Sequence, residues 1–105
     1  MSAYIFDIDG TLVKYHTNIW LEGAKEMLIK LCREGHQIIL ITMRDFKRDE
    51  FKEWSPQRTM ETILNEMDNE KIKFHVLWNV NSPRILCDDS HVELEKRKTN
   101  QSWIK

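Results

Sequence analysis

Apolar residues gather in two short runs in the first half of the chain. Tyr4–Ile8 contains Asp7 and is followed by Asp9 and Gly10, and Gln37–Thr42 is a second run without polar alternation. The first is typical of a buried strand, and the second, without alternation, of a strand that is covered on both faces. We therefore predict two buried strands at these positions.

Two other stretches have the spacing of amphipathic helices. Apolar residues at positions 24, 27, 28 and 31 predict a helix over Trp20–Glu34, which Gly35 would end in a left-handed conformation. The same spacing at 60, 63, 64 and 67 predicts a helix over Pro56–Asn69, with Ser55 as N-cap. The charged stretch between Arg44 and Trp54 is predicted to be a loop.

The last third of the chain contains two short strand candidates, Phe74–Trp78 and Arg84–Cys87, before a polar tail. The connection between them is too short for a parallel crossover, which usually contains a helix. Either Phe74–Trp78 is an antiparallel or edge strand, or the fold is a reduced version. In the tail, Trp103 and Ile104 could pack on the body.

The order strand, helix, strand, helix, strand predicts an open α/β sheet, mainly parallel, with helices on both faces. The 105 residues are enough for one small domain, so we expect a single domain over residues 1–105. Neither Leu12–Gln37 nor Thr42–Phe74 leaves room for a further cap domain.

Polar side chains follow three of the predicted strands. Asp7 and Asp9 follow the first, Thr42 and Arg44 the second, and the pair Asp88–Asp89 the last. Each group alone could be a turn or a cap. In open α/β sheets, however, ligands bind at the carboxyl ends of the strands, where all three groups would meet.

Convergent carboxylates at such an edge suit phosphate chemistry. Mg²⁺ takes one or two carboxylates together with phosphate oxygens. One carboxylate could attack the phosphorus, and a second could exchange protons with the leaving group and with water. The sequence therefore predicts a magnesium-dependent site.

Charge and cysteine content narrow the function classes. With 16 basic and 17 acidic residues, the net charge of −1 gives no general attraction to nucleic acid or anionic membranes. Cys32 and Cys87 lack zinc-site spacing. They could form a disulfide, but reduced thiols are the simpler expectation. Neither a signal peptide nor a membrane-spanning run is visible, and we expect a cytoplasmic protein.

Three motifs resemble those of the haloacid dehalogenase (HAD) superfamily. DIDGTL at Asp7–Leu12 resembles the DxDGT signature, and IILITMR at Ile38–Arg44 resembles the second motif. ILCDD at Ile85–Asp89 is similar to the fourth motif. The resemblance covers most of the chain and implies a Rossmann-like fold without a cap, as in small capless members.

The resemblance also implies roles for the residues after the first strand. Asp7 would be the phosphate-accepting nucleophile and a Mg²⁺ ligand. Asp9 would be the general acid and base, with its backbone carbonyl on the metal, and an aspartate here is typical of the phosphatases. Gly10 and Thr11 would contact the substrate.

Further roles are implied at the other strand ends. Thr42 would hydrogen-bond the phosphoryl group, Asp88 would be a further metal ligand, and Asp89 an alternate or outer ligand. The basic residue that the superfamily places near its nucleophile has no obvious match. Arg84 is the candidate replacement, and Arg44 a candidate substrate contact, although either could be a solvated surface arginine.

The motifs predict a hydrolase of phosphoric monoesters that acts through phospho-Asp7, with Mg²⁺ as cofactor. Its open site would admit a small molecule or a polynucleotide end, or a neighbouring copy in an oligomer could cover it. One alternative is a polynucleotide 3′-phosphatase. The other is a catalytically weak or inactive binding domain, suggested by the unmatched basic residue.

Overall fold

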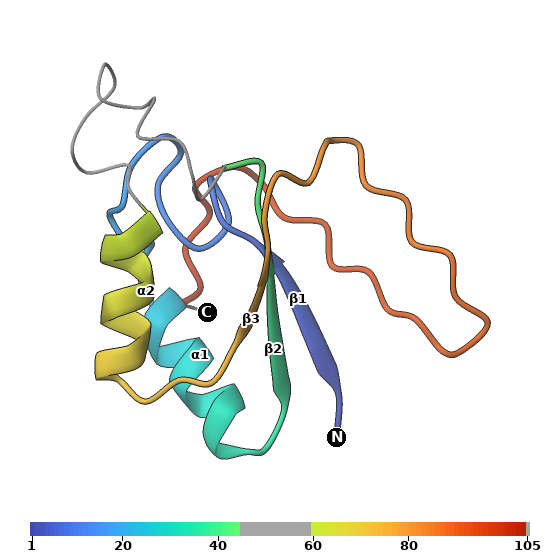
Figure 1. Cartoon of the computed structure of the whole chain (residues 1–105), viewed down its shortest axis with the longest axis horizontal. Coiled ribbons are helices and arrows are strands. Elements are labelled where there is room, and N and C mark those ends of the chain that lie inside the picture. The colour runs from blue at the N-terminus through green and yellow to red at the C-terminus, as the bar shows by residue number, and fades with distance from the viewer. Residues whose placement is uncertain (45–59, 105) are drawn as a thin grey trace.

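The computed structural model describes residues 1–44 and 60–104, without the side chains of Met60 and Glu61. Its centre is a parallel sheet of three strands, β1 (Ala3–Asp7), β2 (Gln37–Ile41) and β3 (His75–Leu77), in the order β1-β2-β3 (Figure 1). Phe6 lies opposite Leu40, which lies opposite Val76 on its other side. The carboxyl ends of all three strands therefore meet at one edge.

Two helices connect the strands. Helix α1 spans Ala24–Arg33 and α2 spans Met60–Asn69. Helix α1 begins later than the spacing predicted, because Gly23 adopts a left-handed φ of 80° and Leu21 donates its N–H to the carbonyl of Leu12 instead. Gly35 ends the helix with a φ of 86°, as predicted. The predicted start of α2 at Pro56 lies outside the described residues.

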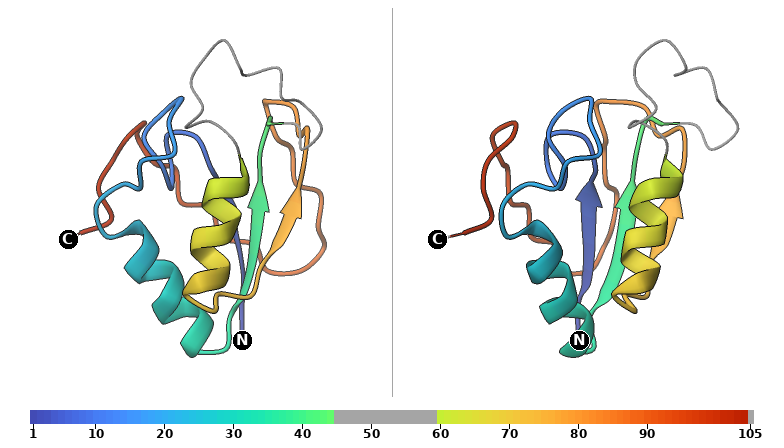
Figure 2. Two further views of the ribbon diagram at one scale, coloured as in Figure 1. Left: turned by 60° about the vertical axis from the view of Figure 1, so that its left-hand side comes forward. Right: turned by 90° about the vertical axis from the view of Figure 1, so that its left-hand side faces the viewer.

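Both helices lie on the same face of the sheet (Figure 2). We had expected helices on both faces, and the difference follows from the strand order. Each crossover moves to the next strand in the same direction, and right-handed crossovers in one direction place their helices on one side. On the opposite face, Ile5 and Leu77 remain about half exposed.

The core lies between the sheet and the two helices. Its side chains come from alternate positions of the strands, from the inner faces of both helices and from the loop after β1. The members that are at most 1% exposed are Ile8, Leu12, Val13, Ala24, Leu28, Ile38, Leu40, Ile63 and Met67. The loop after β1 thus contributes side chains directly to the core, and this packing anchors the loop.

The predicted last strand is wrong. Arg84–Cys87 pairs with no described strand and lies in the long segment that extends away from the sheet (Figure 1). Phe74–Trp78 does contain a strand, β3, at the edge of the sheet and parallel to β2. The short connection after β3 explains the difference, because it cannot hold the crossover that a further parallel strand needs.

The described residues form a small α/β fold of the Rossmann-like type and contain no cap domain. Cys32 and Cys87 are free thiols, as expected. Among residues 1–44 and 60–104, no helix has the length and apolar character needed to cross a membrane.

Candidate active site

Asp7 is the last residue of β1, and a tight loop follows it. The carbonyl of Ile8 accepts hydrogen bonds from the N–H groups of Thr11, Leu12 and Val13. Gly10 makes this turn with a φ of 82°, where a side chain would be strained. The hydroxyl of Thr11 then lies 3.4 Å from Oδ2 of Asp7. The loop after β1 therefore brings the Thr11 hydroxyl back beside the Asp7 carboxylate.

Arg84 lies beside the other oxygen of Asp7. Its Nη1 is 3.2 Å from Oδ1 of Asp7, and its Nη2 is 3.4 Å from the carbonyl of Val80. Burial raises the pKa of the Asp7 carboxyl above its ordinary value of 3.8, and the charge and hydrogen bond of Arg84 oppose that shift. The guanidinium is thus placed where the missing basic residue was expected.

Asp9 has a different partner. The Nε of Arg44 is 2.9 Å from one oxygen of Asp9, and Nη2 is 2.6 Å from the other, a bidentate pair. The same guanidinium donates to Oδ1 of Asn18 at 2.7 Å and to the carbonyl of Thr17 at 2.8 Å. Its side chain is only 2% exposed. Four acceptors therefore enclose the guanidinium.

The geometry shows Arg44 engaged by protein groups, and its contact with a substrate stays a prediction. Arg44 does follow β2 at the expected edge, but its side chain turns inward and is buried against Asp9 and Asn18. The physical reason is that a buried carboxylate needs a partner, and the arginine provides two parallel hydrogen bonds to it. In this structure Arg44 holds Asp9.

Thr42 follows β2 at the same edge and is also buried, at 1% exposure. Its Oγ1 accepts a hydrogen bond of 3.0 Å from the backbone N–H of Arg44. Its own N–H donates to Leu77, and its carbonyl accepts from Val80. Thr42 thus joins β2 to the segment after β3, and its role toward a phosphoryl group stays a prediction.

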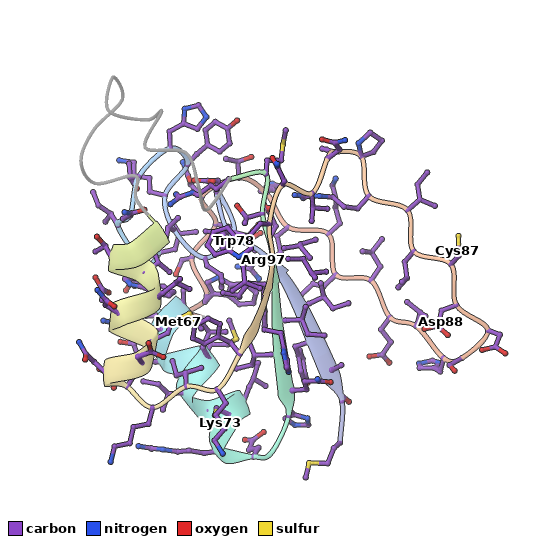
Figure 3. All side chains as sticks on the ribbon, in the orientation of Figure 1. Met67, Lys73, Trp78, Cys87, Asp88 and Arg97 are labelled. Atoms are coloured by element: carbon purple, nitrogen blue, oxygen red, sulfur yellow. The ribbon has the colours of Figure 1, made fainter. Side chains whose placement is uncertain are left out.

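The two acidic residues of the last motif are not at this edge. Asp88 lies in the segment that extends beyond the sheet (Figure 3), where it accepts a hydrogen bond from the N–H of Ser90 at 2.8 Å. Asp89, its neighbour, is exposed as well. Both were expected as metal ligands, and the structure contradicts that placement because their strand does not form. The described residues hold no cluster of three metal-ligating side chains.

Lys73 lies near the start of β3, at the edge opposite the strand ends (Figure 3). Lys71 also precedes β3 in the chain. Neither lysine therefore takes the position that Arg84 occupies beside Asp7.

The sequence reasoning missed two groups at the site. Asn18 is buried at 8% exposure against Arg44, and no motif marked it. The second is the contact of the tail with the site, where Nε1 of Trp103 donates to the carbonyl of Thr11 at 2.7 Å. A tryptophan within a polar tail indicated that the tail packs on the body, but it did not indicate which part of the body.

Comparison with known proteins adds the family. Residues 4–53, which include α1, β2 and all of β1 but its first residue, match the family model of the haloacid dehalogenase-like hydrolases. This match, over slightly less than half of the chain, supports membership of the haloacid dehalogenase superfamily. No curated protein and no solved structure matched the chain. Together with the α/β fold, the match supports a hydrolase of this superfamily, and the matched stretch includes Asp7, Asp9, Thr42 and Arg44.

Proposed function

We propose that this HAD hydrolase cleaves phosphoric monoesters through a phosphorylated Asp7. The observation that carries the proposal is the pairing of Asp7 with Arg84 at the carboxyl end of β1. A half-buried carboxylate beside a guanidinium can receive an anionic phosphate, because the cation offsets part of the repulsion between them. The unmatched basic residue was the reason for considering an inactive domain, and Arg84 beside Asp7 weakens that reason.

In the first step, an oxygen of Asp7 attacks the phosphorus and the ester P–O bond breaks. The leaving oxygen takes a proton from the protonated carboxyl of Asp9. In the second step, water attacks the phosphorus, Asp9 takes the proton of that water, and the bond to Asp7 breaks. Inorganic phosphate leaves and both side chains return to their starting state.

Arg44 limits how Asp9 can do this. It occupies one lone pair on each oxygen of Asp9, while a second lone pair on each remains for a proton. The bidentate pair also fixes the plane of the carboxylate, so the proton is exchanged in a defined direction.

The donor set near Asp7 partly fits a magnesium ion. The carboxylate of Asp7 and the backbone carbonyl of Asp9 are hard oxygen donors, and Mg²⁺ commonly binds one or two carboxylates and completes its shell with water and phosphate. When bound, the ion would neutralise charge on the phosphoryl group. The side chain of Asp9 is engaged by Arg44, so it is the carbonyl of this residue that we assign to the metal.

Phosphate release from an aryl phosphate, with Mg²⁺ or with EDTA, tests this function. The unmodified chain should turn over the substrate only with Mg²⁺, and Asp7→Asn should abolish turnover because an amide is not a nucleophile. Acid quenching during turnover should trap the mass of one phosphoryl group on the peptide that contains Asp7. Full activity of Asp7→Asn would refute the mechanism.

A panel of phosphate esters then tests the substrate class. Sugar phosphates, nucleotides and an oligonucleotide with a 3′-phosphate would be compared at equal concentration. A preference for the oligonucleotide that falls steeply with salt would favour the polynucleotide 3′-phosphatase. Binding of Mg²⁺ without hydrolysis of any ester would instead favour a binding domain.

A further inference from the structure

Residues 97–104, here called the C-terminal strap, lie against the loop that follows Asp9. The N–H of Asn100 donates to the carbonyl of Gly10 at 2.8 Å. The side-chain Oδ1 of Asn100 accepts from the N–H of Tyr15 at 2.7 Å. Asn100 thus bonds both ends of the segment from Gly10 to Tyr15. The strap therefore bridges the two ends of this loop by hydrogen bonds, without forming a β-sheet with it.

Trp103 makes the second connection to the same loop. Its Nε1 donates to the carbonyl of Thr11 at 2.7 Å, and its backbone N–H donates to the carbonyl of Glu22 at 2.8 Å. Its ring meets Phe6 of β1 edge to face, with ring centroids 5.8 Å apart. The strap therefore reaches from the site loop into the core beside β1.

Arg97 holds the strap in this shape. Its guanidinium carbon lies 3.4 Å from the centroid of a Trp103 ring, a close cation–π contact. Its Nη2 donates to the carbonyl of Ser102 at 2.7 Å and faces the carbonyl of Gln101 at 3.3 Å. The strap is thus braced internally as well as bonded to the loop.

The strap also packs closely against Gly10. A Cβ built on Gly10 would lie 3.1 Å from Cγ2 of Thr99, closer than ordinary van der Waals contact. The positive φ favours glycine here, and a side chain would also press on Thr99 of the strap. Loop and strap are fitted to one another at the residue that follows Asp9.

We propose that the C-terminal strap is a positioning element of the active site, which holds the loop from Gly10 to Tyr15 so that Asp7, Asp9 and Thr11 keep their catalytic geometry. The proposal rests on the function proposed above. The strap touches the loop through the carbonyls of Gly10 and Thr11 and acts through them, since the Thr11 hydroxyl faces Asp7 and Gly10 adjoins Asp9.

A pair of substitutions at Asn100 tests the strap with little change to the backbone. Asn100 has a φ of 61°, which glycine adopts without strain and aspartate tolerates. Asn100→Gly removes the acceptor for the N–H of Tyr15, whereas Asn100→Asp keeps it. We expect Asn100→Gly to lower kcat by about 10-fold with little change in KM, because small misplacement of catalytic groups costs up to about 100-fold. Asn100→Asp should restore most of the kcat.

Two further variants separate positioning from general stability. Trp103→Phe keeps an aromatic ring for Arg97 and Phe6 but removes the donor to Thr11, so it should lower kcat as well. Lys98→Gln is the matched control, because Lys98 is exposed in the same segment and its recorded contacts are through its backbone. Thermal unfolding of all variants would show that they remain folded at the assay temperature.

Amide hydrogen exchange supplies a readout that does not depend on activity. The amide of Tyr15 should exchange faster in Asn100→Gly and keep its protection in Asn100→Asp. If the unmodified chain hydrolyses no phosphate ester, the proposed function fails, while this exchange still tests the strap. Unchanged exchange, or faster exchange together with an unchanged kcat, would overturn the positioning role.

Discussion

Replacing Arg44 by methionine should destabilise the protein strongly. The guanidinium is 2% exposed and the Asp9 carboxylate 16%, with two hydrogen bonds between them and two more to Asn18 and Thr17. Methionine fills similar space without a charge. The substitution therefore leaves a largely buried carboxylate with no cation beside it, which is the costly way to break an ion pair.

The size of the effect follows from that burial. Breaking a buried pair by removing one partner costs about 3–5 kcal/mol, and the residual exposure of Asp9 favours the lower figure of about 3 kcal/mol. With a urea dependence of about 2 kcal/mol per M, the unfolding midpoint should fall by about 1.5 M. The melting temperature should fall by about 12–24 °C.

Urea unfolding of a double-mutant cycle gives the decisive measurement. Arg44→Met, Asp9→Asn and the double variant would be compared with the unmodified chain. The double variant should cost clearly less than the sum of the two single variants, by about 1–3 kcal/mol, because the second substitution removes the unpaired charge left by the first. Additive effects, or a midpoint for Arg44→Met within about 0.3 M of the unmodified chain, would refute the reasoning.

Two other predictions concern Asp7 and its partner. Arg84→Met should lower kcat/KM by at least about 10-fold yet cost less than about 1 kcal/mol of unfolding free energy, since the pair of Arg84 and Asp7 is about one-third exposed and solvent screens it. Steady-state kinetics and urea unfolding would measure the two effects. A stability loss as large as that of Arg44→Met would contradict this prediction. The raised pKa of Asp7 means that the folded state holds the proton of this carboxyl more tightly than the unfolded state does. Protonated Asp7 therefore stabilises the fold fully below pH 3.8, and this contribution is lost as the pH rises through the folded-state pKa. In EDTA, Asp7→Asn should therefore be more stable than the unmodified chain near neutral pH, with a difference that shrinks in acid, and a difference that grows in acid would contradict the sign.

The elements that the sequence predicted well are those whose pattern is local. The two runs that became β1 and β2 and the helical spacing that became α1 each carry their own signal within a few residues. Gly35 likewise ends α1 as predicted, because a left-handed residue is required there whatever surrounds it. The position of Asp7 at the end of a strand followed from the same local pattern.

The sequence did not indicate the partners of Arg44, because these partners are not local. The place of Arg44 at the end of β2 was correct, but a long side chain at a strand end can turn outward or inward. The turn inward depends on Asn18 and Asp9, which lie 26 and 35 positions earlier. Nothing in the spacing of these residues along the chain indicates that they meet.

The prediction of a strand at Arg84–Cys87 was wrong for a related reason. The apolar residues of this segment favour a strand locally, but a strand also needs a neighbour and a connection long enough to reach it. In the structure Ile85 is 84% exposed and Leu86 is 60% exposed. The short connection therefore prevents a strand that the local sequence favours, and Asp88 lies away from the site (Figure 3).

Arg84 shows why the charge beside Asp7 does not depend on that strand. A cation must place its head group, not its backbone, next to the carboxylate. The arginine side chain is long enough to reach Oδ1 of Asp7 from the irregular segment after β3, and the carbonyl of Val80 lies near its other nitrogen. The contact needs no sheet pairing, so the position of this charge is set by the short connection after β3. That connection excludes the further strand and keeps Arg84 within reach of the end of β1.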